Sequence, residues 1–304
     1  MIQLNVVNET NRLKAVVLGT AQNNGPTPTP AACYDPSSLM HVKAGTYPLE
    51  LQMSEEISAL EDVFKRYNVT VFRPHIIPNC NQIFVRDVAF VIDDKIIKSN
   101  ILPDRENEFS AMSYILDQID SRKIIELPET CHVEGGDVIL YNEYLFVGVY
   151  TGSDYSDFIT ARTNQKAIDA LKSLFPHKIL KTFELKKSNT EPEENALHLD
   201  CCFQPIGKGK ALIHKAGFLN PLDCQFLENL FGKENLFQAS KTEMANMNCN
   251  VFSISEDIVV SEQNFTRLNQ WLRLRGFIVE EVAYSEISKQ GGLFRCSTMP
   301  LIRT

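Results

Sequence analysis

The sequence predicts an α/β fold, a five-bladed propeller built from ββαβ modules. Two observations predict it. Short apolar runs typical of strands alternate with helical segments along the chain, and the order strand, strand, helix, strand recurs roughly every 50 to 60 residues. Units of this size bury their apolar faces against their neighbours, so we expect one closed ring. No stretch between the units has the composition of a linker, and residues 1–304 are therefore predicted to form a single domain.

The predicted modules follow one another in chain order. The first has a strand at 13–19, a loop at 20–47, an apolar helical stripe at positions 57, 60, 64 and 67, and a strand at 69–72. The second has strands at 83–92, 95–97 and 124–125 and a helix near 110–119. The third has strands at 133–140, 144–148 and 178–183 and a helix at 165–175. The fourth shows strands at 197–203 and 211–213, and the fifth has strands at 250–254, 258–260 and 278–280 and a helix at 265–275.

Composition limits the classes of partner. The formal net charge of −8 is spread without a basic stripe, which argues against a nucleic-acid partner. No apolar run approaches the ~20 residues that span a bilayer, and the first residues lack the basic and apolar regions of an export signal. We therefore expect a cytoplasmic protein with no membrane partner; a homo-oligomer is left open. The eight cysteines contain no C-x-x-C pair, so we expect mostly reduced core thiols.

The end of the chain carries the candidate nucleophile. Cys296 follows Gly291 and Gly292, and adjacent glycines permit positive φ and close approach to the backbone. Such a turn could lie beneath a reactive side chain, so Cys296 is predicted to be catalytic. The alternative is a packed C-terminal strand after a turn, because free cysteine is among the most buried residue types.

Polar residues fall at corresponding places in three modules. The first predicted strands of the second, third and fourth modules carry Asp87, then Glu134 and Asp137, then His198 and Asp200. In a radial array corresponding strand ends converge on the axis, so these side chains could meet Cys296 there. Turn acids and a core histidine are the alternatives. Buried carboxylates need a partner, however, and Arg86 alone could not pair with all of them, which favours a cationic ligand.

Four short motifs resemble those of the arginine deiminase and amidinotransferase superfamily, guanidino-modifying enzymes with the five-bladed α/β propeller, or pentein, fold. The motifs are FVRD at 84–87, EGGD at 134–137, HLD at 198–200 and GGLFRCSTMPL at 291–301. They occur in the family's order, and weaker similarity covers most of the chain. The segments at 69–74 and 250–254 resemble the glycine amidinotransferase branch, whereas EGGD and the segment at 161–168 resemble the deiminase branch.

The resemblance implies a role for each residue. A guanidinium group is planar and stays protonated, so Asp87 and Asp200 are expected to clamp it. Cys296 would attack the guanidinium carbon as a thiolate and form a covalent thiouronium adduct. His198 would protonate the departing amine and then take a proton from the incoming nucleophile, while Glu134 orients it. Neither a cofactor nor a metal is required.

Three further residues complete the predicted binding site. Asp137 is either a substrate contact or a brace for the glycine turn. The resemblance places Arg105 and Arg162 where related enzymes grip an amino-acid carboxylate; a surface ion pair between Arg105 and Glu108 is the alternative. The expected partner is a small guanidino compound such as arginine or a derivative of it.

Two reactions share this machinery. Water would release a ureido product and make the enzyme a hydrolase, whereas an acceptor amine would make it an amidinotransferase. We favour hydrolysis because EGGD resembles the deiminase branch. The joint presence of the acids, His198 and Cys296 argues against a catalytically silent binding propeller. The acids also argue against a cysteine protease, because they would repel a developing oxyanion.

Overall fold

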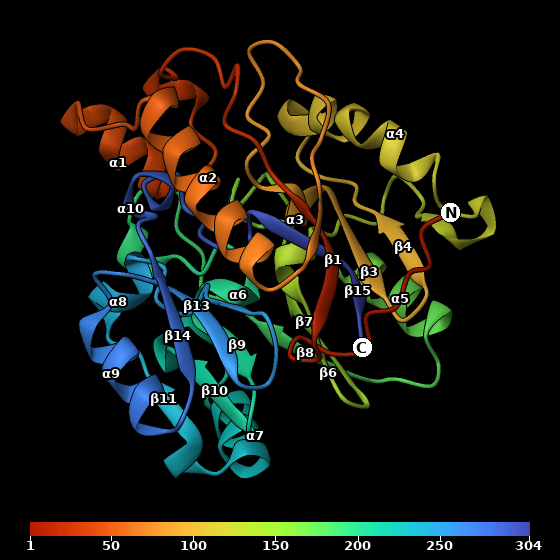
Figure 1. Ribbon diagram of the computed structural model, residues 1–304, viewed down its shortest axis with the longest axis vertical. Coiled ribbons are helices and arrows are strands. Elements are labelled where there is room, and N and C mark those ends of the chain that lie inside the picture. Colours follow the sequence, from red (N-terminus) through yellow and green to blue (C-terminus); the bar gives the residue numbers. More distant parts are fainter.

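The computed structural model describes residues 1–304 and contains five three-stranded sheets arranged as blades (Figure 1). In every blade the first strand is antiparallel to the second, and the third is parallel to the second. Four blades are continuous in sequence: β3 (Ala89–Ile92), β4 (Lys95–Lys98) and β5 (Ile124–Glu126); β6 (Val138–Tyr141), β7 (Tyr144–Val149) and β8 (Ile179–Glu184); β9 (Phe203–Ile206), β10 (Lys210–Ile213) and β11 (Leu236–Gln238); β12 (Phe252–Ser253), β13 (Ile258–Glu262) and β14 (Ile278–Val282).

The remaining blade joins the two ends of the chain. Its strand order is β15 (Thr298–Arg303), β1 (Leu13–Leu18) and β2 (Thr70–Phe72), and Thr298 lies opposite Leu18. Figure 1 shows the blue C-terminal strand beside the red N-terminal one. The C-terminal strand thus supplies the first strand that the N-terminal module lacks in the sequence. The predicted five-bladed α/β propeller is confirmed.

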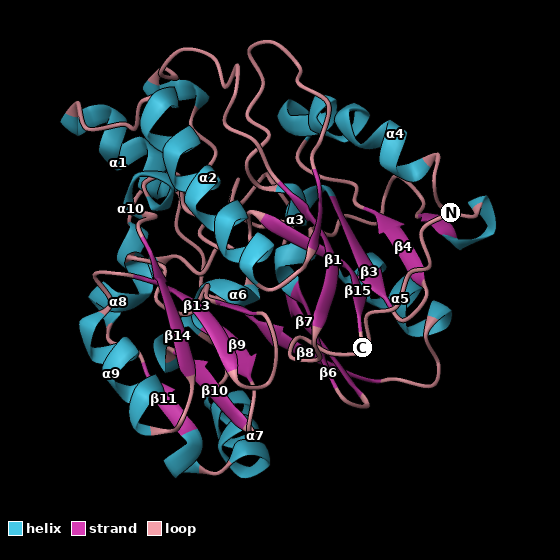
Figure 2. Cartoon of the chain, in the orientation of Figure 1, coloured by secondary structure: helices cyan, strands magenta, loops and turns pink.

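The longer helices cover the outside of the blades, whereas the short helical turns at 85–88 and 199–202 are completely buried (Figure 2). The α-helices are α1 (Pro36–Ala44), α2 (Glu50–Arg66), α3 (Val85–Val88), α4 (Ser113–Leu116), α5 (Gln165–Leu174), α6 (Leu199–Cys202), α7 (Pro221–Phe231), α8 (Lys241–Ala245), α9 (Thr266–Leu274) and α10 (Ser285–Ser288). The first strands β3 and β9 are completely buried, whereas the third strands β5 and β11 are partly exposed. The first strands therefore form the inner part of the ring.

The predicted first strands are shorter than the sequence suggested, and the difference concerns the site. Residues 85–88 and 199–202 form helical turns, and residues 135–137 form a 3₁₀ turn; each turn precedes the first strand of its blade. In each the backbone closes an i to i+3 hydrogen bond, for example from Asp87 N to Phe84 O. The prediction was wrong here because a short apolar run carries no period that separates a strand from a helical turn. The predicted acids and His198 therefore precede the strands.

Other predicted elements change less. The segment at 20–47 contains a 3₁₀ turn and helix α1, so it is more than a loop. The expected helix near 110–119 is a 3₁₀ segment (Pro103–Met112) followed by α4. The fourth blade gains α7 and β11, which the sequence analysis did not identify. All eight cysteines are free, as expected, and six of them are buried. None of the helices is both long and apolar enough to cross a membrane.

Candidate active site

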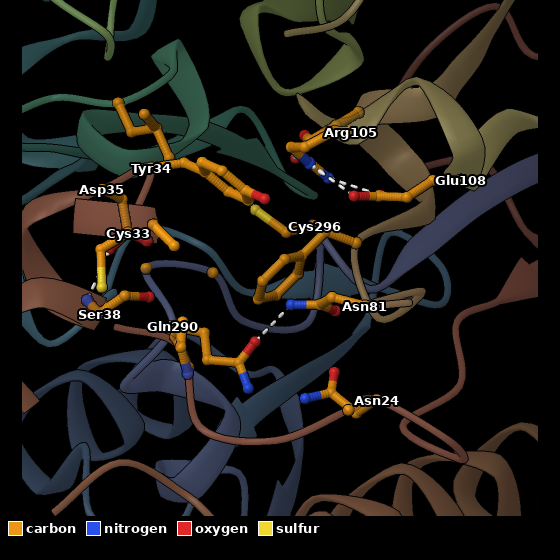
Figure 3. Close-up of a pocket in the computed structure, with 18 of the residues that line it drawn as sticks. Asn24, Cys33, Tyr34, Asp35, Ser38, Asn81, Arg105, Glu108, Gln290 and Cys296 are labelled. Carbon is orange, nitrogen blue, oxygen red and sulfur yellow. Dashed lines mark hydrogen bonds and ion pairs between the residues drawn. The ribbon is translucent and has the colours of Figure 1, made fainter. Parts of the chain in front are cut away.

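A cavity of about 220 Å³ lies where the helical turns meet the segment at 20–47. Five of the eight predicted site residues line it, namely Asp87, Arg105, Arg162, His198 and Cys296. Glu134, Asp137 and Asp200 lie behind this lining and are at most 1% exposed. Figure 3 shows Cys296 facing the cavity, with Tyr34 and Asp35 from the 20–47 segment on one side and Arg105 with Glu108 on another.

The loop before β15 presents Cys296. Gly291 has φ of +75°, a conformation that side chains rarely adopt, and a Cβ atom on Gly292 would lie 2.5 Å from the Phe84 ring. The two glycines are therefore needed for different reasons, a left-handed backbone and a close approach. The Cys296 sulfur lies 3.7 Å from Asp200 Oδ2. Burial, and then the carboxylates of Asp200 and Asp87, raise the pKa of the Cys296 thiol well above its usual value.

His198 is held at one ring nitrogen and free at the other. Its Nε2 lies 2.8 Å from Glu134 Oε2, whereas Nδ1 has no hydrogen-bond partner and lies 3.7 Å from Asp87 Oδ1. A Cβ atom on Gly136 would lie 2.5 Å from Nδ1, so this glycine makes room for the ring. Burial opposes protonation, but the Asp87 charge and the Glu134 hydrogen bond outweigh it and raise the pKa of His198 to about 9. The imidazole is thus protonated at neutral pH.

Glu134 is a fully ionised anchor. Its two oxygens accept from Arg162 Nη1 at 3.0 and 3.1 Å, and Arg105 Nη1 lies 3.6 Å away. Burial alone would raise the pKa of Glu134, but Arg162 and His198 lower it far below its usual value. Asp87, Glu134 and His198 also bring three atoms of metal-ligand type within 4.8 Å. Because Arg162 already donates to both Glu134 oxygens, this set fits a metal ion poorly.

Arg105 and Arg162 are engaged with protein acceptors. Arg105 donates through Nε and Nη2 to the two oxygens of Glu108, at 2.8 and 2.9 Å, and through Nη1 to Asp87 Oδ2 at 2.9 Å. The suggested pair with Glu108 thus forms, but it is buried rather than on the surface. Arg162 also donates to Tyr34 O at 2.9 Å, which ties the 20–47 segment to the site.

Asp200 and Asp137 are satisfied by the protein itself. Asp200 Oδ2 accepts from Arg295 Nη1 at 2.9 Å, and Arg295 pairs in turn with Glu9. Asp137 accepts from the Leu199 amide at 2.9 Å and from the Thr163 hydroxyl at 2.7 Å. These contacts favour the brace over the substrate contact for Asp137. Together with the pairs of Asp87 with Arg105 and of Glu134 with Arg162, they also show that the buried acids find donors within the chain, which removes that part of the argument for a cationic ligand.

Sequence reasoning missed three side chains of this site: Glu9, Asn250 and Arg295. Glu9 and Arg295 form a buried ion pair that reaches Asp200, and Asn250 contacts the Cys296 sulfur at 3.2 Å. Arg295 carried a signal, because it is a charged residue directly beside the candidate nucleophile in an otherwise largely apolar segment. Glu9 carried none, since a single acid in a polar N-terminal stretch suggests a surface residue.

Comparison with known proteins identifies related sequences. A family profile described as arginine deiminase matches residues 6–228. YkgA, an uncharacterised protein of Bacillus subtilis (strain 168), is 31% identical over 254 residues, which are 82% of this chain and 80% of that protein. An arginine deiminase of Listeria monocytogenes serotype 4b is 27% identical over 265 residues, which are 74% of this chain and 62% of that enzyme. The chain thus spans less than two thirds of that enzyme's length.

Solved structures share the fold. The N-terminal domain of ArgZ, an arginine dihydrolase from cyanobacteria, superposes with a TM-score of 0.78 at 17% identity and covers 95% of this chain and 98% of that one. SxtG, an amidinotransferase from Microseira wollei, superposes with a TM-score of 0.74 at 17% identity and covers 99% and 97%. These likenesses concern the fold. Because the family profile spans most of the sequence, the chain belongs to the arginine deiminase family, within the pentein superfamily of guanidino-modifying enzymes.

Proposed function

We propose that this protein is a guanidino-group hydrolase that converts an arginine-like substrate to a ureido product through a covalent thiouronium adduct on Cys296. One observation carries the proposal: Cys296, the unpartnered His198 Nδ1 and the unpartnered Asp87 Oδ1 all belong to one cavity. A nucleophile, a proton donor and an anionic acceptor for the substrate cation are the groups that the reaction needs.

The first half of the reaction begins with substrate binding. The guanidinium donates to Asp87 Oδ1, and its charge offsets the carboxylates that hold Cys296 in the thiol form. The Cys296 thiol then releases its proton to solvent, the thiolate attacks the guanidinium carbon, and an S–C bond forms. As the C–N bond to the leaving amine breaks, His198 donates its Nδ1 proton to that nitrogen. The products of this half are an amine or ammonia and the thiouronium adduct.

Water completes the second half. His198, now neutral, takes a proton from water, and the oxygen attacks the adduct carbon. The C–S bond breaks, the sulfur leaves as the thiolate, and the product carries one oxygen from solvent. Glu134 holds the ring by Nε2 throughout, so Nδ1 performs both transfers. An amine in place of water would give a new guanidine, which is the amidinotransferase reaction with the same residues.

Isotope labelling separates the two reactions. With arginine as sole substrate in ¹⁸O-labelled water, we expect one label in the ureido product, whether or not glycine or ornithine is present. Mass spectrometry of the intact protein should show the adduct forming and decaying. An adduct that is stable in water but is discharged by an amine, giving an unlabelled guanidine, would establish the amidinotransferase. Failure of every guanidino compound to react would remove both assignments.

The nucleophile is tested by substitution. Cys296→Ser should abolish turnover and still bind substrate, because the hydroxyl is a far weaker nucleophile than a thiolate while the acids remain. Cys224→Ser is the matched control, because Cys224 lies on α7 and does not line the cavity. Its sulfur makes one hydrogen bond, to Lys215 O at 3.5 Å. Near-normal activity of Cys296→Ser would show that the covalent mechanism is wrong.

A further inference from the structure

Asn250 holds the same position in the fifth blade that Asp87 and Cys296 hold in theirs. Each of the three lies two residues before the first strand of its blade, β12, β3 or β15. All three are almost completely buried, and Asn250 is 0% exposed. In four blades the residues just before the first strand include a predicted site residue, and in the fifth blade they include the amide side chain of Asn250. Its contacts indicate what the amide does there.

The loop between α10 and β15 (residues 289–297), which carries Cys296 and is called the nucleophile loop below, contacts Asn250 through its backbone. The backbone N–H groups of Leu293 and Cys296 both donate to its Oδ1, each at 3.2 Å, and Arg295 N donates to its backbone oxygen at 3.4 Å. A backbone N–H can only donate, so the amide oxygen must face these two groups. The amide nitrogen must then face the other way, where it lies 3.2 Å from the Cys296 sulfur. The orientation of the side chain is therefore fixed by chemistry.

Apart from the Asn250 amide, the Leu293 backbone N–H, which also donates to Asn250 Oδ1, favours the thiolate, whereas the charged groups that act most strongly on the sulfur are carboxylates. Its thiol proton points to Asp200 Oδ2 at 3.7 Å, a contact that suits the thiol and becomes repulsive once the proton leaves. The charge of Asp87 also disfavours the thiolate, and the Arg295 guanidinium is already paired with Asp200 and Glu9. A thiolate at this place needs a donor, and a hydrogen bond to a charged group is stronger than one to a neutral group.

We propose that Asn250 is a catalytic residue of this site: its amide N–H donates to the Cys296 sulfur and stabilises the thiolate that attacks the substrate. The inference rests on the proposed role of Cys296 as the nucleophile. The competing explanation is that Asn250 only braces the loop through its oxygen. The first explanation depends on the amide nitrogen of Asn250, and the second depends on its amide oxygen. A substitution that changes one of these atoms can therefore distinguish them.

Asn250→Asp performs the separation. It keeps an oxygen for the two loop N–H groups and replaces the donor nitrogen with an acceptor. We expect alkylation of Cys296 by iodoacetamide, measured by peptide mass spectrometry between pH 7 and 9, to slow about 10- to 100-fold, the loss expected for a hydrogen bond to a charged group. The value of kcat/KM should fall by a similar factor, while Cys296→Ser defines the background. The alkylation readout needs no turnover, so it stays informative even if the hydrolase assignment fails.

Asn248→Asp is the matched control, because it makes the same change, including the added negative charge, two residues away, where no hydrogen bond joins the side chain to Cys296. It should leave Cys296 reactivity within twofold of the wild type. If Asn250→Asp does not fold, Asn250→Ser is used instead; its shorter hydroxyl reaches neither the loop N–H groups nor the sulfur, so unchanged Cys296 reactivity in this variant would also overturn the proposal. Cys296 reactivity within twofold of wild type in the folded variant would overturn the proposal and leave the brace.

Discussion

Asp87 and Asp200, the two acids predicted to clamp the substrate, differ in the partners that the protein already provides for them. Asp200 is 0% exposed, does not line the cavity, and accepts from Arg295, which Glu9 holds in turn. Asp87 lines the cavity and accepts from Arg105 through one oxygen, while its Oδ1 has no partner. The same residue type thus serves as part of the ring's core in one blade and as an open acceptor in the next but one.

This difference bears on how a guanidinium would bind. The sequence analysis assigned both acids to one clamp, yet each already binds a guanidinium of the chain, Asp200 that of Arg295 and Asp87 that of Arg105. Only Asp87 keeps an oxygen, Oδ1, that has no partner. A substrate cation would therefore find its free acceptor at Asp87, whereas Asp200 would act mainly on the sulfur, 3.7 Å away. Asp200 should then contribute more to stability and Asp87 more to catalysis, and substitutions can test this difference.

The largest effect is expected for Asp200→Asn on stability. Removing one charge of a buried pair leaves Arg295 with one carboxylate instead of two, and such losses typically cost about 3 kcal/mol. Urea unfolding at pH 7 should show this loss. Asp223→Asn is the matched control: its partner Lys181 is 33% exposed, so the cost should stay below about 1 kcal/mol. Equal costs for the two variants would mean that the ring centre does not depend on Asp200.

A smaller loss of stability and a larger selective loss of activity are expected for Asp87→Asn. Arg105 keeps both hydrogen bonds to Glu108, so the free energy of unfolding should fall by only about 1 kcal/mol. The open Oδ1 loses its charge, and kcat/KM should fall about 10- to 100-fold. Steady-state kinetics with arginine and unfolding curves of the same preparation measure both quantities. If Asp87→Asn and Asp200→Asn gave the same pattern, the comparison between the two acids would fail.

The pKa of His198 also distinguishes Asp87 from Asp200. Burial alone would lower the pKa of His198, but the charge of Asp87 and the hydrogen bond to Glu134 raise it to about 9. Asp200 is not among the main causes. A raised pKa of a cationic group stabilises the fold fully below the unfolded value near 6.5, and this contribution is lost as pH rises through about 9. Asp87→Asn should lower the pKa of His198 in an NMR titration, and Asp200→Asn should leave it nearly unchanged. A larger change with Asp200→Asn would contradict the assignment.

The sequence showed which residues would meet but not how they are held. Asp87, His198 and Cys296 were predicted from motifs and module positions, since periodicity and glycine turns are local properties of a sequence. The helical turns that carry the acids were missed because each has only three or four residues, and so short a segment shows no period that separates a strand from a helical turn. The partners Arg295 and Glu9 are 286 residues apart, and such a contact depends on closure of the ring by β15, which no local pattern encodes.

The smallest effect is expected for a third buried acid, Glu56 on α2, which differs from both acids of the site. Its two oxygens accept only from backbone, the Glu286 and Ile287 amides at 2.9 and 2.8 Å, where α10 leads toward the nucleophile loop. Burial outweighs these bonds and raises the pKa of Glu56 to about 7. A carboxyl with a raised pKa stabilises the fold fully below its unfolded value near 4.5, and this contribution is lost as pH rises through about 7.

Glu56→Gln therefore has an effect whose sign depends on pH. At pH 5 both side chains are neutral, and the variant loses up to about 1 kcal/mol because its NH₂ group cannot accept the second amide. At pH 8 the wild type must bury an ionised carboxylate and the variant need not, so the difference should shrink or reverse. Urea unfolding at the two pH values measures it, with kcat/KM expected within about twofold. A difference that does not change with pH would mean that Glu56 stays ionised, and that two backbone amides suffice to hold a buried charge that at Asp200 requires Arg295.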